Sequence, residues 1–213
     1  MHWVIKTFST SIGKKTLMAL TGLSFCCFLA VHLIGNLTIY GGPELFNAYV
    51  EHLHSLGPLI TLSEWGLLLL ATVHILTGSI LFFQNLRARP SRYKVNKNAG
   101  GRTLGSATMP YTGFVLLLFI IFHLLDFHFV DHTDQTVYQI VSNSLSQIGT
   151  ASLYLLAVIL AAVHISHGFW SLFQTLGANH PKYMPVIKSV GILFSLIVAT
   201  GFGFIPLFIA FLA

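Results

Sequence analysis

Four histidines lie inside long apolar segments of the sequence, where few other side chains can do chemistry: His32, His74, His123 and His164. The segment around His164, residues 153–174, contains no lysine, arginine, aspartate or glutamate, and it carries a second histidine, His167, one turn later. About 20 mostly apolar residues are enough for a helix to cross a bilayer. Because a titratable side chain is costly in hydrocarbon and marks a functional site by default, we expect each of the four histidines to have a specific partner.

Two motifs around these histidines recur along the chain. In the first, a Thr-Gly pair has its glycine ten residues before a histidine, as in residues 21–32 and 112–123. In the second, a histidine is followed four residues later by a glycine, as in residues 74–78 and 164–168. The copies of the first motif lie 91 residues apart, and those of the second lie 90 residues apart. Two motifs with nearly one period predict an internal duplication, in which helices I and II correspond to helices III and IV.

The composition is that of an integral membrane protein. Of 213 residues, 54% are hydrophobic and 8% are charged, which is outside the range of soluble globular domains, and we expect no nucleic acid partner. The sequence predicts an all-α fold, a single domain over residues 1–213 with five transmembrane helices at about 16–40, 62–86, 106–130, 151–173 and 186–213. The first apolar segment is too long for a cleavable signal peptide, so we expect it to remain as helix I.

The charged residues are segregated along the chain. All eleven basic residues lie before helix I, between II and III or between IV and V, whereas the six acidic residues take the other connections or the start of II. The positive-inside rule then predicts a cytoplasmic N-terminus and an external C-terminus. The acidic connections, residues 35–58 and 126–147, are long enough to form short amphipathic segments that lie over the bundle. Residues 87–102, with their Pro, Asn and Gly, predict an exposed loop.

Distances along the predicted helices separate the four histidines into two levels. His123 lies three residues before Asp126, about 4–5 Å of helix rise, whereas His74 is about 15 Å from the acidic residue of its helix. His32 is about 25 Å from the last lysine before helix I, which puts it at the level of His123. His164 lies as deep in its helix as His74. The predicted pairs are therefore His32 with His123 and His74 with His164.

Two imidazoles at one level on two helices supply the two axial nitrogens of a six-coordinate b-type haem, and glycines one turn away leave space for a porphyrin. A tetrahedral zinc site needs three or four converging ligands, and the separation into two levels argues against it. Interhelical hydrogen bonds are the alternative role for such histidines. The repeated arrangement favours two haem b groups.

The remaining histidines and the cysteines have simpler interpretations. His167 is an alternative to His164 as the haem ligand of helix IV. The repeat favours His164, because Gly168 follows it by four residues as Gly78 follows His74. We therefore expect His167 to lie beside the ligands or the haem propionates. The other six histidines are expected to be solvated, and Cys26 and Cys27 to be apolar packing residues, because no haem-attachment or iron–sulfur motif contains them.

These motifs resemble one family over essentially the whole chain: the five-helix, dihaem cytochrome b subunit (b558 type) of succinate dehydrogenase and quinol:fumarate reductase. The resemblance rests on F-L-A-V-His32-L-I-G-N in helix I, P-E-L-F-N in the following segment, V-His74-I-L-T-G in helix II, T-G with F-His123 in helix III, and V-His164-I-S-H-G-F-W with Q-T-L-G in helix IV.

The resemblance implies haem ligation by His32 and His123 at an outer, distal haem and by His74 and His164 at an inner, proximal haem. It implies a flavoprotein subunit and an iron–sulfur subunit on the cytoplasmic face of a bacterial cytoplasmic membrane. FAD and the iron–sulfur clusters belong to those subunits, and this chain passes electrons between the clusters and menaquinone in a respiratory chain. It carries out no dicarboxylate chemistry itself.

The sequence departs from the family at one position. Some relatives carry a glutamate two residues before the helix IV ligand, proposed to help protons cross; here that residue is Ala162, and helices IV and V contain no acidic residue. This leaves open whether turnover moves charge across the membrane.

A quinone also needs a proton-exchanging group near a haem. Glu51 is our first candidate, ahead of Glu44 and Glu64, because it lies in an amphipathic segment over the outer haem and the family tends to bind quinone on this side. The alternatives are the cytochrome b of a hydrogenase or formate dehydrogenase, and a non-redox transporter or anchor.

Overall fold

The computed structural model describes residues 2–88, 103–131 and 133–211, and every regular element in these ranges is a helix. The elements are α1 (His2–Ser9), α2 (Ser11–Asn36), the 3-10 helix η1 (Leu37–Gly41), α3 (Gly42–Ser55), α4 (Pro58–Arg87), α5 (Leu104–Phe127), α6 (Val137–Leu145), α7 (Ile148–Thr175) and α8 (Met184–Phe211). The predicted all-α class is confirmed.

Five of these helices are long and apolar enough to cross a membrane: α2, α4, α5, α7 and α8. Their lengths run from 24 to 30 residues, or about 36–45 Å at 1.5 Å per residue. Each begins and ends within a few residues of the predicted span, and the first continues directly into η1 and α3. In hydrocarbon a helix satisfies its own backbone hydrogen bonds, which is why five long apolar segments form five helices with the length and composition to span a membrane.

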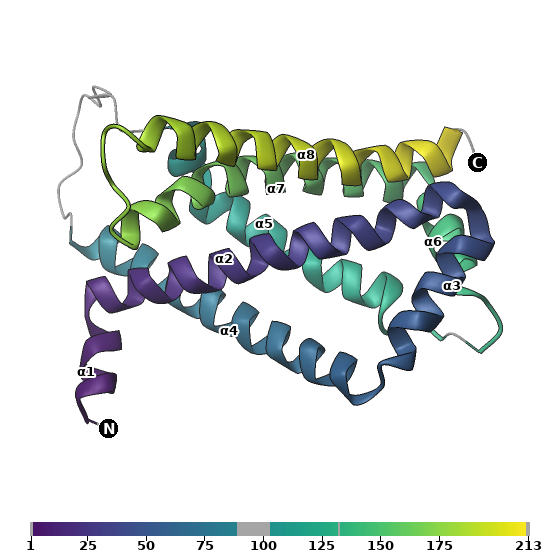
Figure 1. Cartoon of the computed structure of the whole chain (residues 1–213), viewed down its shortest axis with the longest axis horizontal. Helices are drawn as coiled ribbons and strands as arrows, with labels where there is room; N and C mark the ends of the chain where they lie inside the picture. The colour runs from purple at the N-terminus through teal and green to yellow at the C-terminus, as the bar shows by residue number, and fades with distance from the viewer. Residues whose placement is uncertain (1, 89–102, 132, 212–213) are drawn as a thin grey trace.

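The long helices alternate in direction, so α2, α5 and α8 run one way and α4 and α7 run the other (Figure 1). Helix α7 packs between α5 and α8, and α2 crosses both α4 and α7. The α5–α7 crossing is close at Gly105, where an added Cβ would lie 2.7 Å from the Cβ of His167. A residue without a side chain is therefore required at that crossing.

The described basic and acidic residues lie on elements at opposite ends of the bundle, and these elements can be followed in Figure 1. At one end, here called the basic end, lie α1, the start of α2, the end of α4, the α7–α8 connection and the start of α8, with Lys6, Lys14, Lys15, Arg87, Lys182 and Lys188. The predicted loop 87–102 also starts at this end, but beyond Ala88 it lies outside the described residues. All six acidic residues lie at the other end, here called the acidic end, on α3, at the start of α4 and from the last turn of α5 to α6.

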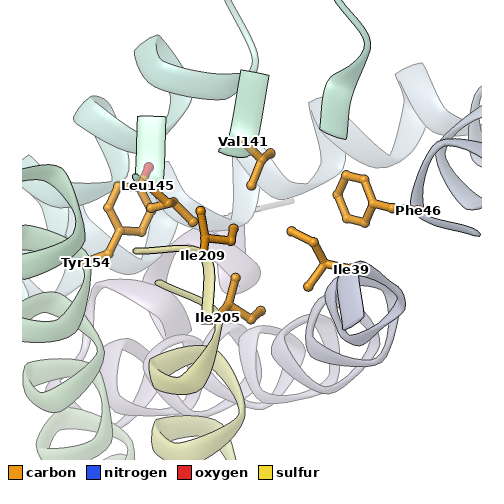
Figure 2. Close-up of a cluster of buried hydrophobic side chains, with 7 residues drawn as sticks. All are labelled: Ile39, Phe46, Val141, Leu145, Tyr154, Ile205 and Ile209. Atoms are coloured by element: carbon orange, nitrogen blue, oxygen red, sulfur yellow. The ribbon is translucent and has the colours of Figure 1, made fainter. Parts of the chain in front are cut away.

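The acidic end is covered by α3 and α6, so the two segments expected to lie over the bundle are helices. Asn47 of α3 joins them, because its side-chain oxygen accepts a hydrogen bond from the backbone N–H of Tyr138 in α6 at 3.1 Å. Beneath them is a cluster of buried side chains from η1, α3, α6, α7 and α8 (Figure 2), comprising Ile39, Phe46, Val141, Leu145, Tyr154, Ile205 and Ile209. This packing closes the acidic end over the helices that carry the histidines.

Helix α1 was not among the predicted elements. It precedes α2 at the basic end, and Thr10 separates the two helices by accepting a hydrogen bond from the backbone N–H of Gly13, as an N-cap residue does. Trp3 of α1 is 73% exposed, and tryptophan is typical of a membrane–water interface.

Candidate functional site

The four intramembrane histidines occupy two levels in the bundle. His32 and His123 each lie four residues before the last residue of their helix, α2 and α5. His74 and His164 each lie 16 residues after the first residue of α4 and α7. Since the ends of α2 and α5 and the starts of α4 and α7 are all at the acidic end, the two levels are separated by about 18 Å of helix rise.

At each level the structure brings two histidines together. The ring centroids of His32 and His123, here called the end pair, are 6.0 Å apart. Those of His74 and His164, here called the central pair, are 6.5 Å apart. The end pair joins α2 to α5, and the central pair joins α4 to α7.

The central pair is anchored by two threonines in matching positions. The hydroxyl of Thr21 donates to the Leu17 carbonyl at 2.7 Å and lies 2.9 Å from Nδ1 of His74. A threonine hydroxyl has a single proton, so Nδ1 of His74 carries the hydrogen of that second bond. This assigns the tautomer from the hydrogen-bond network and leaves Nε2 with a free lone pair.

His164 has the same environment one repeat later. Its Nδ1 lies 3.0 Å from the hydroxyl of Thr112, which itself donates to the Thr108 carbonyl at 3.1 Å. Both threonines are buried, at 4% and 5% exposure, so water does not replace them as partners. In both histidines of the central pair the unprotonated nitrogen is therefore Nε2, whose lone pair is free.

The glycines of the two motifs also repeat their contacts. A Cβ added at Gly22 would lie 3.8 Å from Cε1 of His74, and one added at Gly113 would lie 3.4 Å from Cε1 of His164. The glycines four residues after these histidines face two methionines, with Met18 against Gly78 and Met109 against Gly168. The repeated sequence is thus Met-x-x-Thr-Gly, longer than the Thr-Gly pair that sequence analysis singled out.

The end pair is anchored by different groups. Nδ1 of His123 lies 3.3 Å from the hydroxyl of Tyr154, which donates to Oδ2 of Asp126 at 3.1 Å. Ser144 of α6 donates to the same carboxylate oxygen at 2.7 Å. The hydroxyl of Tyr154 has a single proton, which is already used in its hydrogen bond to the carboxylate. Nδ1–H of His123 is therefore the donor to the phenol oxygen.

His32 is held mainly by packing. Its ring stacks on Phe28 with centroids 5.1 Å apart and an interplanar angle of 15°, and it contacts Phe202 of α8 at 5.5 Å. The side-chain nitrogen of Asn36 lies 3.4 Å from its Nδ1 but donates a shorter bond, 2.8 Å, to its backbone carbonyl. The polar anchor of the end pair is therefore on the His123 side.

The geometry favours a two-ligand metal group at each level. Among the described residues, no three His, Cys, Asp or Glu side chains converge as a metal site. Two imidazoles on opposite sides of one metal, with metal–nitrogen bonds of about 2.0 Å, have ring centroids about 6 Å apart. The separations of 6.0 and 6.5 Å fit this spacing, and in haem the porphyrin supplies the other four nitrogens.

His167 lies next to the central pair but belongs to neither pair. It is half-buried at the basic side of His164, its ring meets Trp170 edge-on at 4.8 Å, and its Nδ1 is 3.5 Å from the hydroxyl of Thr103. Lys188 of α8 lies over the same tryptophan ring, with Nζ 4.8 Å from the Trp170 ring centroid. The contacts of His167 with Trp170 and Thr103 therefore lie outside both pairs.

The structure does not bring Glu51 into contact with the end pair. Glu51 lies on the exposed face of α3, and its side chain forms no hydrogen bond or ion pair with the described residues. Asp126, expected in the connection between two helices, lies instead in the last turn of α5 and bonds Tyr154 and Ser144. Cys26 and Cys27 are free thiols in α2.

Sequence analysis missed the polar partners of the histidines. The threonines were within the repeated motif, but only the glycines were given a role. Asp126 and Tyr154 are separated by 28 residues, and no local pattern relates them. A search of family models, curated proteins and solved structures finds no match to the chain.

Proposed function

We propose that the chain is the dihaem cytochrome b subunit of a succinate:quinone oxidoreductase, a succinate dehydrogenase or a quinol:fumarate reductase. The observation that carries the proposal is the presence of two histidine pairs at two levels, each with the ring separation of two axial ligands of one metal. Haem bound between each pair would supply one-electron transfer between the iron–sulfur subunit and menaquinone. The repeated contacts of Thr21 with His74 and of Thr112 with His164 support the duplication that the motifs predict.

The residues of the chain have defined tasks in this function. Thr21, Thr112 and Tyr154 hold Nδ1 of three histidines, which leaves Nε2 of each free to bind the iron of a haem. Such partners fix the orientation of an imidazole ligand and raise its basicity. Aromatic rings around the end pair, from Phe28, Phe202 and their neighbours, keep water from the ligands.

The decisive experiment is a visible spectrum of the purified chain, together with a pyridine haemochrome assay against protein concentration. We expect two haem b per chain and reduced absorption bands typical of bis-histidine haem. A colourless protein would contradict the proposal and favour a transporter or an anchor. A hydrogenase or formate dehydrogenase cytochrome would be distinguished by its co-purifying subunits, which would carry nickel or molybdenum in place of FAD.

The proposed orientation has the basic end in the cytoplasm of a bacterium, by the positive-inside rule, with the flavoprotein and iron–sulfur subunits docked there and the acidic end outside. The central pair then belongs to the inner haem and the end pair to the outer haem. A reporter fused after Lys94 should give a cytoplasmic signal, and one fused after Asp134 an external signal. The opposite result would reverse the orientation and both haem assignments.

Glu51 is retained as a proposed proton-exchanging group for the quinone at the acidic end. Its exposed position on α3 gives it access to water, but the described contacts supply no link to the end pair. In the variant Glu51→Gln we expect loss of quinone-linked turnover with both haems retained. Turnover at the wild-type rate would remove Glu51 from the site.

A further inference from the structure

The end pair has a hydrogen-bonded chain that the central pair lacks. It runs from Ser144 and Asp126 through Tyr154 to Nδ1 of His123, and it joins α5, α6 and α7. Its links measure 2.7, 3.1 and 3.3 Å. The phenol ring of Tyr154 is only 8% exposed and belongs to the buried cluster of Figure 2, so the position of its hydroxyl is set by packing.

We infer that Tyr154, oriented by Asp126, is a positioning residue that makes His123 a more electron-donating ligand and thereby lowers the reduction potential of the outer haem. This inference rests on the proposed function. It concerns a residue for which the repeated motifs provide no counterpart.

The physical reason lies in the direction of the bonds. The phenol O–H of Tyr154 donates a hydrogen bond to the carboxylate of Asp126. This bond increases the negative charge on the phenol oxygen and makes that oxygen a stronger acceptor for Nδ1–H of His123. A stronger acceptor at Nδ1 leaves more electron density at Nε2 and raises the basicity of the ligand. A more basic ligand stabilises ferric over ferrous iron, so the potential of that haem falls.

Packing makes the contact specific to one ligand. The Tyr154 ring lies 5.9 Å from the His123 ring and also contacts Phe119 and Phe127, at 5.0 and 5.6 Å. No hydrogen bond joins Tyr154 to His32 in the described residues. The chain of bonds therefore acts on one iron ligand of the four.

The test is a redox titration of the full haem-loaded chain, with each haem followed separately by its absorbance and its low-spin ferric EPR signal. The haems are assigned from the histidine variants described in the Discussion. At a fixed applied potential, Tyr154→Phe should raise the reduced-to-oxidised ratio of the outer haem by several-fold, up to about tenfold, which is 59 mV for one electron. Its EPR signal should shift, and the inner haem should change in neither respect.

Two further variants and a control complete the design. Asp126→Asn keeps the tyrosine and its packing but removes the negative charge that accepts the phenol hydrogen bond. We expect the potential of the outer haem to rise by a smaller amount than in Tyr154→Phe. This variant carries the test if Tyr154→Phe does not accumulate in the membrane. Tyr138→Phe removes the phenol hydroxyl of a tyrosine in α6 whose ring contacts Phe46. This hydroxyl has no hydrogen bond to a histidine among the described residues, so the variant should leave both haems unchanged.

The inference is overturned if Tyr154→Phe and Asp126→Asn each retain both haems and alter neither the potential nor the EPR signal of the outer haem, or if they alter both haems equally. A wild-type chain without haem would instead overturn the proposed function, and this inference with it. The two failures are therefore distinguishable.

Discussion

The central and end pairs hold their histidines with opposite kinds of partner. In the central pair each Nδ1 faces a threonine hydroxyl, whose proton bonds the backbone of its own helix. In the end pair one Nδ1 faces a tyrosine backed by a carboxylate. A threonine whose hydroxyl bonds its own helix adds no charge, so it is tolerated in the middle of the hydrocarbon. A carboxylate is tolerated only where the helix ends nearby and other polar groups surround it. Depth in the membrane thus explains the chemistry of the anchors.

Replacing one histidine at a time is the strongest way to separate the two pairs. Under the proposed function each haem iron has two protein ligands, so His74→Ala and His164→Ala should each lose the inner haem and keep the outer one. His32→Ala and His123→Ala should each lose the outer haem and keep the inner one. Haem content per chain should fall by half, as measured by the pyridine haemochrome assay, and one EPR signal should vanish.

His167→Ala is the matched control, since His167 lies next to the central pair without belonging to it. It should keep both haems. Loss of a haem in this variant, with none lost in His164→Ala, would show that the ligand of α7 is assigned to the wrong histidine.

Removing the threonine anchors should weaken the central pair alone. Thr21→Val and Thr112→Val are nearly isosteric, and each leaves a buried Nδ1–H without an acceptor, a cost of about 1–3 kcal/mol. Loss of such a partner typically reduces metal affinity about 10–100-fold. We expect faster transfer of the inner haem to apomyoglobin, by similar factors in the two variants, and unchanged transfer of the outer haem.

Thr72→Val serves as the control for the threonine variants, because Thr72 is exposed on α4 and its hydroxyl bonds only the Leu68 carbonyl. Its haem transfer should match that of the wild type. If the inner haem were transferred to apomyoglobin no faster from Thr21→Val than from the wild type, the anchoring role of the threonines would be refuted.

Loosening the cover of the acidic end should affect the end pair to a smaller extent. Asn47→Ala removes the acceptor of the Tyr138 N–H and should cost about 1 kcal/mol, or about 2–4 °C in Tm for a chain of this size. Thermal release of the outer haem should occur at a lower temperature, with the inner haem unaffected. Asn47→Asp keeps an acceptor and should restore the wild-type temperature.

The smallest effect is expected at the surface of the acidic end. Glu64 and His128 are about half-exposed and lie 4.0 Å apart, so Glu64→Gln should change the free energy of unfolding by less than about 0.5 kcal/mol. Chemical denaturation monitored at each haem should give midpoints equal to those of the wild type. A larger change would mean that this end depends on surface charge rather than on the packing beneath α3 and α6.

The sequence predicts the helices of this fold well because each depends on local composition. Apolar length alone identifies α2, α4, α5, α7 and α8, and the position of each histidine within its helix predicts which two share a level. The partners of Nδ1 are different, because they depend on which faces of two helices meet. The Met-x-x-Thr-Gly repeat would have indicated Thr21 and Thr112 as partners of the histidines. The contact of Tyr154 with Asp126 depends instead on how α5 and α7 cross, and no sequence pattern in either helix predicts it.

The origin of each pair in two distant helices has a consequence for biosynthesis. A nascent chain that has released only α2 and α4 into the membrane contains His32 and His74 but neither partner, which lie about 90 residues later. The end pair forms after α5 has been inserted, and the central pair only after α7. Under the proposed function, cofactor loading therefore follows insertion of nearly the whole polypeptide, and a chain truncated before α7 would retain at most the outer group.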